Sequence, residues 1–399
     1  MPAPGYDKWI EIDLDAIKSN FTEIKKILDE DVRLIAVVKA DAYGHGAVAV
    51  AQLLYNNGVD FFAVSYLEEA LKLRNAGLKA SIMLFCPLID SEDMKQAVEN
   101  NVVISITSYK EAEILNEAAM RLNKMARVHL KIESGLHRFG LNEEEALEVC
   151  RYLSGNPCIY IEGIYTHMAY AADEKYTEKQ FKHFMQVVSR LEREGFDIPI
   201  KHCANSTVFL RYSHMHLNAV RIGTLLSGQH PLGKFEKRLN LKDPYKFKSR
   251  IISIKEVSKG SYLGYFKTYR LKKDAKIAVI PVGFRDGLAL EVANPPVGFI
   301  DFLKITAKRF LAYLNDPRYC MKVKIKGKLY PVRGKVFMQM ALVELPLEAE
   351  IDVGDEVEVP VRKTLTSDNV PRFYISQGEP GKLEADNRMV YLTGSEEGL

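Results

Sequence analysis

The stretch RLIAVVKADAYGHG (residues 33–46) begins with a short, almost continuously apolar run and ends in a polar loop. Such a run is typical of a strand in a parallel sheet that is covered on both faces. Similar runs recur along the first part of the chain, each separated from the next by a helical pattern or a turn. They span residues 60–65, 81–85, 102–106, 126–132, 159–165, 199–203 and 217–223.

The segments between these runs have the periodicity of amphipathic helices. In the first, Leu14, Ile17, Phe21 and Ile24 recur on one helical face, and Asp13 precedes them as a helix cap. Eight strands, each followed by a helix or helical turn, predict a (β/α)8 TIM-like barrel. An open doubly wound sheet is the alternative, but it would normally carry a GxGxxG motif after its first strand, and none is present there.

Beyond residue 245 the pattern changes to short runs of alternating apolar and polar residues with glycine turns, which are typical of antiparallel strands. The prediction is therefore an α/β barrel over residues 10–245, followed by a mainly-β C-terminal domain. That second domain is expected to comprise residues 246–399 together with residues 1–9. A helical insertion at about residues 288–325 interrupts it.

Composition limits the possible partners. The 55 Lys and Arg residues nearly balance the 52 Asp and Glu residues, so the charge of +3 gives no case for binding nucleic acid or a membrane. No apolar stretch reaches the ~18 residues of a membrane helix, and no secretory signal is visible. Five cysteines without a CxxC pair favour the cytoplasm. The HMH run at residues 214–216 has no second ligand pair, so no metal site is expected.

Barrel enzymes place their active sites at the C-terminal ends of the strands. Lys39 ends the first apolar run, where loss of solvation would lower its pKa and make it a Schiff-base nucleophile. A strand-end lysine that simply reaches water is the alternative. Ser206, Gly223 and Thr224 follow the last two strands, where barrels commonly bind phosphate, although they could be ordinary loop or capping residues.

Other polar residues follow the remaining strands. His167 could be a hydrogen-bonded core histidine, and Lys131 and Arg138 could belong to a solvated loop. Arg221 is buried by pattern and needs an acceptor, either a structural carboxylate or the nitrogen of a heteroaromatic ring. A strand-end lysine combined with a phosphate site across the last two strands describes a pocket for pyridoxal 5'-phosphate, which acts as an electron sink.

Several motifs together resemble the alanine racemase family of fold-type III pyridoxal phosphate enzymes. The resemblance covers about residues 8–287 and resumes around residues 330–358. Its motifs are VVKADAYGHG (37–46), LKIESGLHRFG (130–140), HCANS (202–206), VRIGT (220–224) and LGYFKTY (263–269).

The resemblance implies a role for individual residues. Lys39 would bind the cofactor covalently and act as one acid/base, while Tyr265 of the partner subunit would act on the opposite face of the substrate. A homodimer with shared active sites follows. The remaining implied roles are phosphate binding by Tyr43, Ser206, Gly223 and Thr224, ring contacts by His167 and Arg221, substrate-carboxylate contacts by Arg138 and Met338, and carbamylation of Lys131.

Some positions depart from the family pattern. Phe284, Leu290 and Gln339 stand where the family usually has tyrosine, arginine and aspartate, and Tyr374 is only a weak substitute for a C-terminal phosphate-binding tyrosine. The leading prediction is racemisation of L- and D-alanine. The alternatives are a racemase of the same family for serine, lysine or ornithine, a fold-type III decarboxylase, and a non-catalytic cofactor-binding protein.

Overall fold

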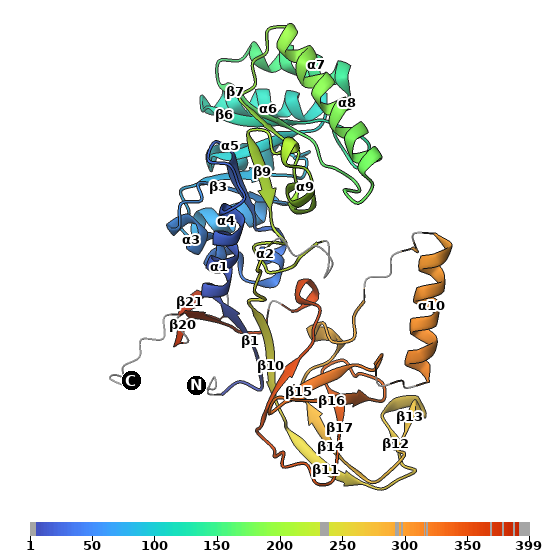
Figure 1. Ribbon diagram of the computed structural model, residues 1–399. Helices are drawn as coiled ribbons and strands as arrows, with labels where there is room; N and C mark the ends of the chain where they lie inside the picture. Colours follow the sequence, from blue (N-terminus) through green and yellow to red (C-terminus); the bar gives the residue numbers. More distant parts are fainter. Residues whose placement is uncertain are drawn as a thin grey trace, which may run out of the picture. The chain divides into compact units, whose positions relative to one another are not determined.

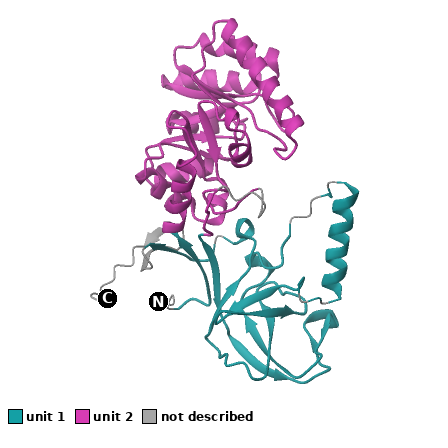
Figure 2. Cartoon of the chain, viewed as in Figure 1, with its two compact units in different colours: residues 1–13, 244–399 teal, residues 14–243 magenta. Residues whose placement is uncertain are grey.

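The computed structural model divides the chain into two compact units (Figure 2). Unit 2 comprises residues 14–243, and unit 1 comprises residues 1–13 and 244–399. The structure describes residues 5–231, 239–291, 295–296, 298–314, 316, 318–367 and 369–376, together with the backbone of residues 379–385 and 388–390.

Unit 2 contains eight parallel strands in the order β8-β7-β6-β5-β4-β3-β2-β9. The two end strands approach each other, since Arg221 N–H donates to the Ala204 carbonyl at 2.9 Å. The result is a nearly closed barrel, and the predicted fold class is confirmed. The strands are β2 (Arg33–Val37), β3 (Phe61–Val64), β4 (Ser81–Leu84), β5 (Val102–Ile106), β6 (Ala126–Lys131), β7 (Ile159–Tyr165), β8 (Ile200–His202) and β9 (Ala219–Ile222).

Helices connect successive barrel strands (Figure 1). Their first turns use the caps that the sequence offers: the Asp90, Ser108 and Asp173 side chains accept hydrogen bonds from the backbone N–H groups of α5, α6 and α8. The helices are α1 (Leu14–Lys25), α2 (Lys39–Gly44), α3 (Ala47–Asn56), α4 (Leu67–Asn75), α5 (Ser91–Glu99), α6 (Tyr109–Leu122), α7 (Glu143–Ser154), α8 (Glu174–Arg193) and α9 (Ser206–Arg211).

One cluster of buried side chains belongs to the barrel strands. Ile35 and Val37 of β2 and Phe61 and Ala63 of β3 belong to it, because alternate residues of a strand face the same side. Met83, Val103 and Tyr165 extend the cluster around the barrel. These side chains fix the positions of the strand ends, where the polar residues of the candidate site begin.

Unit 1 contains an eleven-stranded sheet in the order β11-β14-β17-β16-β15-β18-β10-β1-β19-β20-β21. The opening strand β1 pairs antiparallel with β10 and parallel with β19. The strands are β1 (Lys8–Asp13), β10 (Tyr245–Arg250), β11 (Ser253–Val257), β14 (Ala275–Ile280), β15 (Lys322–Ile325), β16 (Lys328–Arg333), β17 (Ala341–Leu345), β18 (Glu356–Val359), β19 (Arg372–Ser376), β20 (Glu379–Ala385) and β21 (Arg388–Val390).

The predicted insertion at residues 288–325 contains one helix, α10 (Phe299–Tyr313), coloured orange in Figure 1. No residue of α10 is buried, and Phe299 and Phe310 are 73% and 61% exposed. The last part of the predicted range is not helical, because residues 322–325 form β15 of the sheet. Within the residues that the structure describes, no helix has the length and apolar character needed to cross a membrane.

Candidate active site

A cavity of about 530 Å³ lies at the C-terminal ends of the barrel strands. Its size is within the usual range for a cofactor or small-molecule site. All the candidate residues that the sequence placed in the barrel line this cavity: Lys39, Tyr43, Lys131, Arg138, His167, Ser206, Arg221, Gly223 and Thr224.

The charge of the cavity is one-sided. Its lining residues include Lys39, Lys131, Arg138 and Arg221, and none of the described lining residues is Asp or Glu. Four cations without an acidic neighbour in the wall create a positive potential in a partly closed space. Such a potential favours an anionic ligand, such as a phosphate group or a carboxylate.

Lys39 begins α2, two residues after the last residue of β2. The Val38 N–H donates to the Ala63 carbonyl at 2.9 Å, so strand pairing continues to the residue before Lys39. The Lys39 side chain is half-buried and lines the cavity. Burial lowers the pKa of Lys39, and the positive charge of Arg138 lowers it further. The amine therefore loses its proton more readily than a solvated lysine, as a nucleophile requires.

The backbone conformation directly after Lys39 is unusual. Ala40, Asp41, Ala42 and Tyr43 have φ values of 49°, 52°, 51° and 58°, which place four successive residues in the left-handed region. This conformation costs about 1–2 kcal/mol for each residue with a side chain. Strain of this kind persists only where the surrounding structure holds it, and it is often associated with functional sites. Sequence reasoning did not predict this turn, because none of the four residues is glycine.

One end of the cavity brings together Tyr43, Ser206, Gly223 and Thr224. The Gly223 N–H donates to Ser206 Oγ at 3.3 Å. A Cβ atom at residue 223 would lie 2.3 Å from the Tyr43 hydroxyl oxygen, so the close approach of this ring requires glycine. The hydroxyl groups of Tyr43, Ser206 and Thr224 thus lie near Gly223, which has no side chain. Hydroxyl and N–H donors of this type suit phosphate oxygens.

Arg221 is 3% exposed and projects from β9. Its Nη1 donates to His202 Nδ1 at 2.7 Å and its Nη2 to the Thr166 carbonyl at 2.7 Å. Among the residues that the structure describes, the acceptors of Arg221 are thus a histidine ring nitrogen and backbone carbonyls, and none is a carboxylate. Burial lowers the pKa of Arg221 to about 10, which still leaves the guanidinium charged at neutral pH.

A buried chain of hydrogen bonds continues behind Arg221. His202 Nε2 lies 2.8 Å from His129 Nδ1, and His129 Nε2 lies 3.3 Å from Glu162 Oε2. Burial lowers the pKa of both histidines, so we assign them as neutral. His202 then accepts from Arg221 and donates to His129, which donates to Glu162. Sequence reasoning listed His202 after its strand but missed His129 and Glu162, which precede the strand ends.

His167 and Tyr165 form another part of the wall. His167 Nδ1 lies 3.4 Å from Arg221 Nη2, and burial, together with the charge of Arg221, holds the pKa of His167 well below its usual value. Tyr165 stacks on His202 with ring centroids 4.9 Å apart. Tyr165 also lines the cavity, and sequence reasoning missed it because it was one of several apolar residues in its strand.

Lys131 is the last residue of β6, and Arg138 lies in the loop that follows it. Lys131 is 1% exposed, and its Nζ donates to the Ile132 carbonyl at 2.7 Å. Burial lowers the pKa of Lys131 to about 8; Glu133 opposes this shift, whereas Arg221 and Arg138 reinforce it. Lys131 is therefore not a solvated loop residue. Arg138, in contrast, is exposed and packs its guanidinium 4.8 Å from the Phe139 ring centre.

The last two candidate residues belong to unit 1. Tyr265 lies in the 3-10 helix η3 (Tyr265–Lys267), is 66% exposed and makes an edge contact with Phe337 at 5.2 Å. Met338 is 57% exposed, and its carbonyl accepts from Arg285 N–H at 3.0 Å. Both side chains are thus exposed on unit 1, and Phe337, which contacts Tyr265, directly precedes Met338 in the chain.

The positions that depart from the family pattern also lie in unit 1. Phe284 begins the 3-10 helix η4 (Phe284–Asp286) and is 40% exposed, and Leu290 is 37% exposed. Tyr374 lies in β19 and is completely buried. A buried tyrosine in the centre of a sheet is a core residue of that sheet, so it does not present a hydroxyl group on the surface of unit 1.

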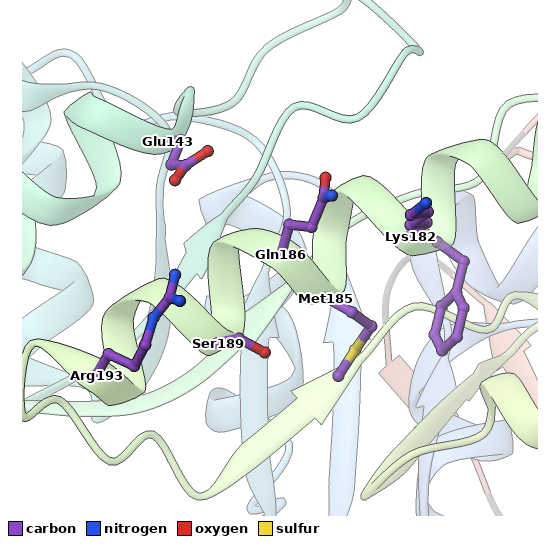
Figure 3. Close-up of a pocket in the computed structure, with 7 residues that line it drawn as sticks. Glu143, Lys182, Met185, Gln186, Ser189 and Arg193 are labelled. Atoms are coloured by element: carbon purple, nitrogen blue, oxygen red, sulfur yellow. The ribbon is translucent and has the colours of Figure 1, made fainter.

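A second hollow, of about 790 Å³, lies along α8 on the outside of the barrel (Figure 3). Its wall includes Glu143, Lys182, Gln186, Ser189 and Arg193. Acidic and basic side chains are mixed here, and none of the candidate residues lines it. The candidate residues of unit 2 are therefore found in the cavity at the strand ends and not in this hollow.

A parallel barrel with a half-buried lysine at a strand end, followed by a mainly-β unit, is the architecture that the resemblance to fold-type III enzymes implies. Comparisons with known proteins agree. A model described as "Alanine racemase, N-terminal domain" matches residues 12–231, and "Alanine racemase, C-terminal domain" matches residues 245–372. The chain belongs to the alanine racemase family, and the predicted resemblance is confirmed.

Individual relatives cover most of the chain. Alanine racemase 1 of Caldanaerobacter subterraneus subsp. tengcongensis is 35% identical over 357 residues, which cover 88% of this chain and 84% of that protein. Alanine racemase of Methanococcus maripaludis is 34% identical over 355 residues, covering 88% of both chains. The solved structure of alanine racemase from Clostridium difficile 630 has a TM-score of 0.84 and 30% identity, covering 96% of this chain and 99% of that one.

Proposed function

We propose that this protein is a pyridoxal phosphate-dependent racemase that interconverts L-alanine and D-alanine. The observation that carries the proposal is Lys39, a lysine with a lowered pKa that lines a cavity with cationic and no acidic described residues in its wall. The family to which the chain belongs supports the reaction. The five cysteines of the sequence, which include no CxxC pair, support a reducing, cytoplasmic location for it.

The residues of the cavity suit the cofactor. Tyr43, Ser206, Gly223 and Thr224 would hold its phosphate, because they supply hydroxyl and N–H donors at one end of the cavity. The hydrogen bonds of Arg221 to His202 and Thr166 use only its Nη atoms, so its Nε–H would serve the ring nitrogen. His167 would contact the ring, and Lys39 would bind the cofactor covalently.

The cofactor, when bound, supplies an electron sink for the pair of electrons left when Cα of the substrate loses its proton. Lys39 Nζ would hold or return that proton on one face of the substrate. Arg221 donates and does not readily give up its own proton, so it keeps the ring nitrogen unprotonated. Prompt return of a proton by the chain's own bases would then be favoured over side reactions.

Racemisation needs a second base on the opposite face, since a single base tends to return the proton to the face that it left. We assign this role to the partner subunit's Tyr265, within a homodimer that shares its two active sites. Tyr265 is exposed on unit 1, where its ring contacts those of the exposed Phe266 and of Phe337. A surface of this composition is typical of the core of a protein–protein interface.

The substrate carboxylate would meet Arg138 and the backbone of Met338. We further propose that Lys131 forms a carbamate, in which its amine nitrogen bonds to the carbon of CO2 and releases one proton. A pKa of about 8 leaves an appreciable neutral fraction of the amine available for this reaction. The resulting anion would attract Arg138 and steady it toward the substrate.

The decisive experiment combines chemistry at Lys39 with a substrate panel. With pyridoxal phosphate bound, the purified protein should absorb visible light. Borohydride should fix the cofactor to Lys39, and peptide mass spectrometry would identify the modified residue. Alanine should exchange its α-proton in deuterated water and interconvert faster than serine, lysine or ornithine. Lys39→Ala should abolish cofactor fixation, α-proton exchange and interconversion, whereas Lys79→Ala, which changes an exposed lysine, should not. Fixation to another lysine would contradict the assignment.

A further inference from the structure

The left-handed turn after Lys39 is held by a carboxylate from a neighbouring helix. Glu69 of α4 accepts a hydrogen bond from the Ala40 N–H through its Oε1 at 2.5 Å. Ala40 is the residue next to Lys39 and the first of the four residues with positive φ. Glu69 thus contacts the backbone at the point where the chain leaves β2 and enters the strained turn.

The second carboxylate oxygen of Glu69 caps the start of α4. Its Oε2 accepts from the Ser65 N–H at 2.8 Å and from the Tyr66 N–H at 3.0 Å, at the start of α4. Glutamate at this position of a helix commonly caps the backbone in this way. Capping does not require the additional hydrogen bond between Oε1 and the Ala40 N–H. That hydrogen bond connects the segment after β3 with the turn after β2.

The negative charge of Glu69 also acts on Lys39. Glu69 attracts Lys39 electrostatically, whereas Arg138 and Arg221 repel it, and the described residues that line the cavity include no acidic side chain. Glu69 is half-buried outside that lining. It therefore partly balances the cations of the cavity without occupying the space of a ligand.

The rest of the turn is tied to the same helix. Asp41 Oδ1 accepts from the Ala47 N–H at 2.9 Å and lies 3.5 Å from Lys72 Nζ of α4. These contacts hold Asp41, the second residue of the turn, and the contact of Glu69 holds Ala40 beside Lys39. Resting on the proposed function, we infer that Glu69 is a positioning residue that fixes the left-handed turn and thereby aims Lys39 into the cavity.

The test uses the full-length protein and four variants. Glu69→Gln cannot accept through both of its terminal atoms, because one becomes an amide nitrogen. Glu68→Gln is the matched control, since Glu68 is an exposed neighbour on α4 and the change removes the same charge. Glu69→Asp keeps the charge but is shorter. Ala40→Gly combined with Glu69→Gln relaxes the turn, because glycine adopts positive φ without a steric cost.

Two quantities are measured beside the thermal midpoint. The first is the rate at which added pyridoxal phosphate becomes fixable to Lys39 by borohydride, and the second is kcat and KM for alanine. We expect Glu69→Gln to reduce the fixation rate and kcat by roughly 10- to 100-fold with a smaller change in KM, as for a reacting group displaced by about 1 Å. Glu69→Asp should fall between it and the wild type. Adding Ala40→Gly should restore much of both rates.

Three outcomes would overturn the inference. These are a fixation rate for Glu69→Gln equal to that of Glu68→Gln, a loss of rate only in proportion to a lower thermal midpoint, and no restoration by Ala40→Gly. If Glu69→Gln does not fold, Glu69→Asp and its combination with Ala40→Gly provide the same comparison. Failure of the proposed function is distinguishable, because the wild-type protein itself would then lack fixation at Lys39 or activity.

Discussion

Replacing Gly223 with alanine should disturb the candidate phosphate end of the cavity through one defined contact. The added Cβ would lie 2.3 Å from the Tyr43 hydroxyl oxygen and 2.7 Å from its Cε2, where ordinary contacts begin at 3.4 Å. The Tyr43 ring must therefore retreat by about 1 Å, and its backbone is already held in the left-handed turn. Overpacking of this kind typically costs about 1–3 kcal/mol in the free energy of unfolding.

The same displacement should weaken cofactor binding. A hydrogen bond to a charged group is worth about 1.5–3 kcal/mol, so loss of the Tyr43 hydroxyl from its position should raise the Kd for pyridoxal phosphate roughly 10- to 100-fold. Urea unfolding of the cofactor-free protein, followed by circular dichroism, measures the first effect. Equilibrium titration of the visible absorbance measures the second.

A double-mutant cycle tests the cause. In a Tyr43→Ala background the clash disappears, so the stability cost of Gly223→Ala should nearly vanish while cofactor binding stays weak. Gly155→Ala is the matched control, because its Cβ would meet nothing nearer than 3.5 Å. An equal cost of Gly223→Ala with and without the Tyr43 ring would refute the steric reasoning.

The remaining predictions concern the second base, the shared site and the buried lysine. Tyr265→Phe should lower kcat by about 10²–10⁴ while cofactor fixation at Lys39 is retained; an unchanged rate in both directions would exclude Tyr265 as a base. The Lys39→Ala and Tyr265→Ala homodimers should each be inactive, but the two proteins refolded together should regain about a quarter of wild-type activity. Random pairing gives about half mixed dimers, and each mixed dimer has one intact site. Proven mixed dimers without activity would contradict the shared site. Lys131 has a pKa of about 8 in the folded protein instead of the ordinary 10.5, so its buried ammonium group destabilises the folded state below pH 8. As the pH rises from 8 to 10.5, the free energy of unfolding of the wild type should increase by at most about 3 kcal/mol relative to that of Lys131→Met. A constant difference between the unfolding free energies of these two proteins would show that the ammonium is not buried.

The barrel could be predicted because its signal is local and repeated. Each of the eight apolar runs contains one observed strand, from Arg33–Val37 to Ala219–Ile222, and parallel strands covered on both faces are apolar at nearly every position. The environment of α10 was less predictable. Its apolar residues suggest burial, yet none is buried in the structure, because periodicity describes a helix face and does not say what covers it.

The candidate site was predictable where strand ends converge. Lys39 follows β2, whereas Lys131 and Arg221 belong to β6 and β9, and barrel topology brings all three to one cavity. The partners of these residues could not be read in the same way. His129 and Glu162 lie within strands, and their contact with each other depends on the register of β6 and β7, which includes an irregularity between Val128 and His129.

The turn after Lys39 shows why local sequence rules fail where the structure matters most for chemistry. Four successive residues without a glycine would be expected to avoid positive φ, and they adopt it because Glu69 and Asp41 connect the turn to α4 and to the start of α3. The strain cannot be inferred from residues 40–43 themselves, since the contact that stabilises it comes from a glutamate further along the chain. The same turn joins two residues of the candidate site, since Lys39 and Tyr43 both line the cavity and only three residues separate them. The group proposed to bind the cofactor covalently and a group proposed to bind its phosphate are thus set by one backbone segment, so a change at Glu69 should affect both functions together.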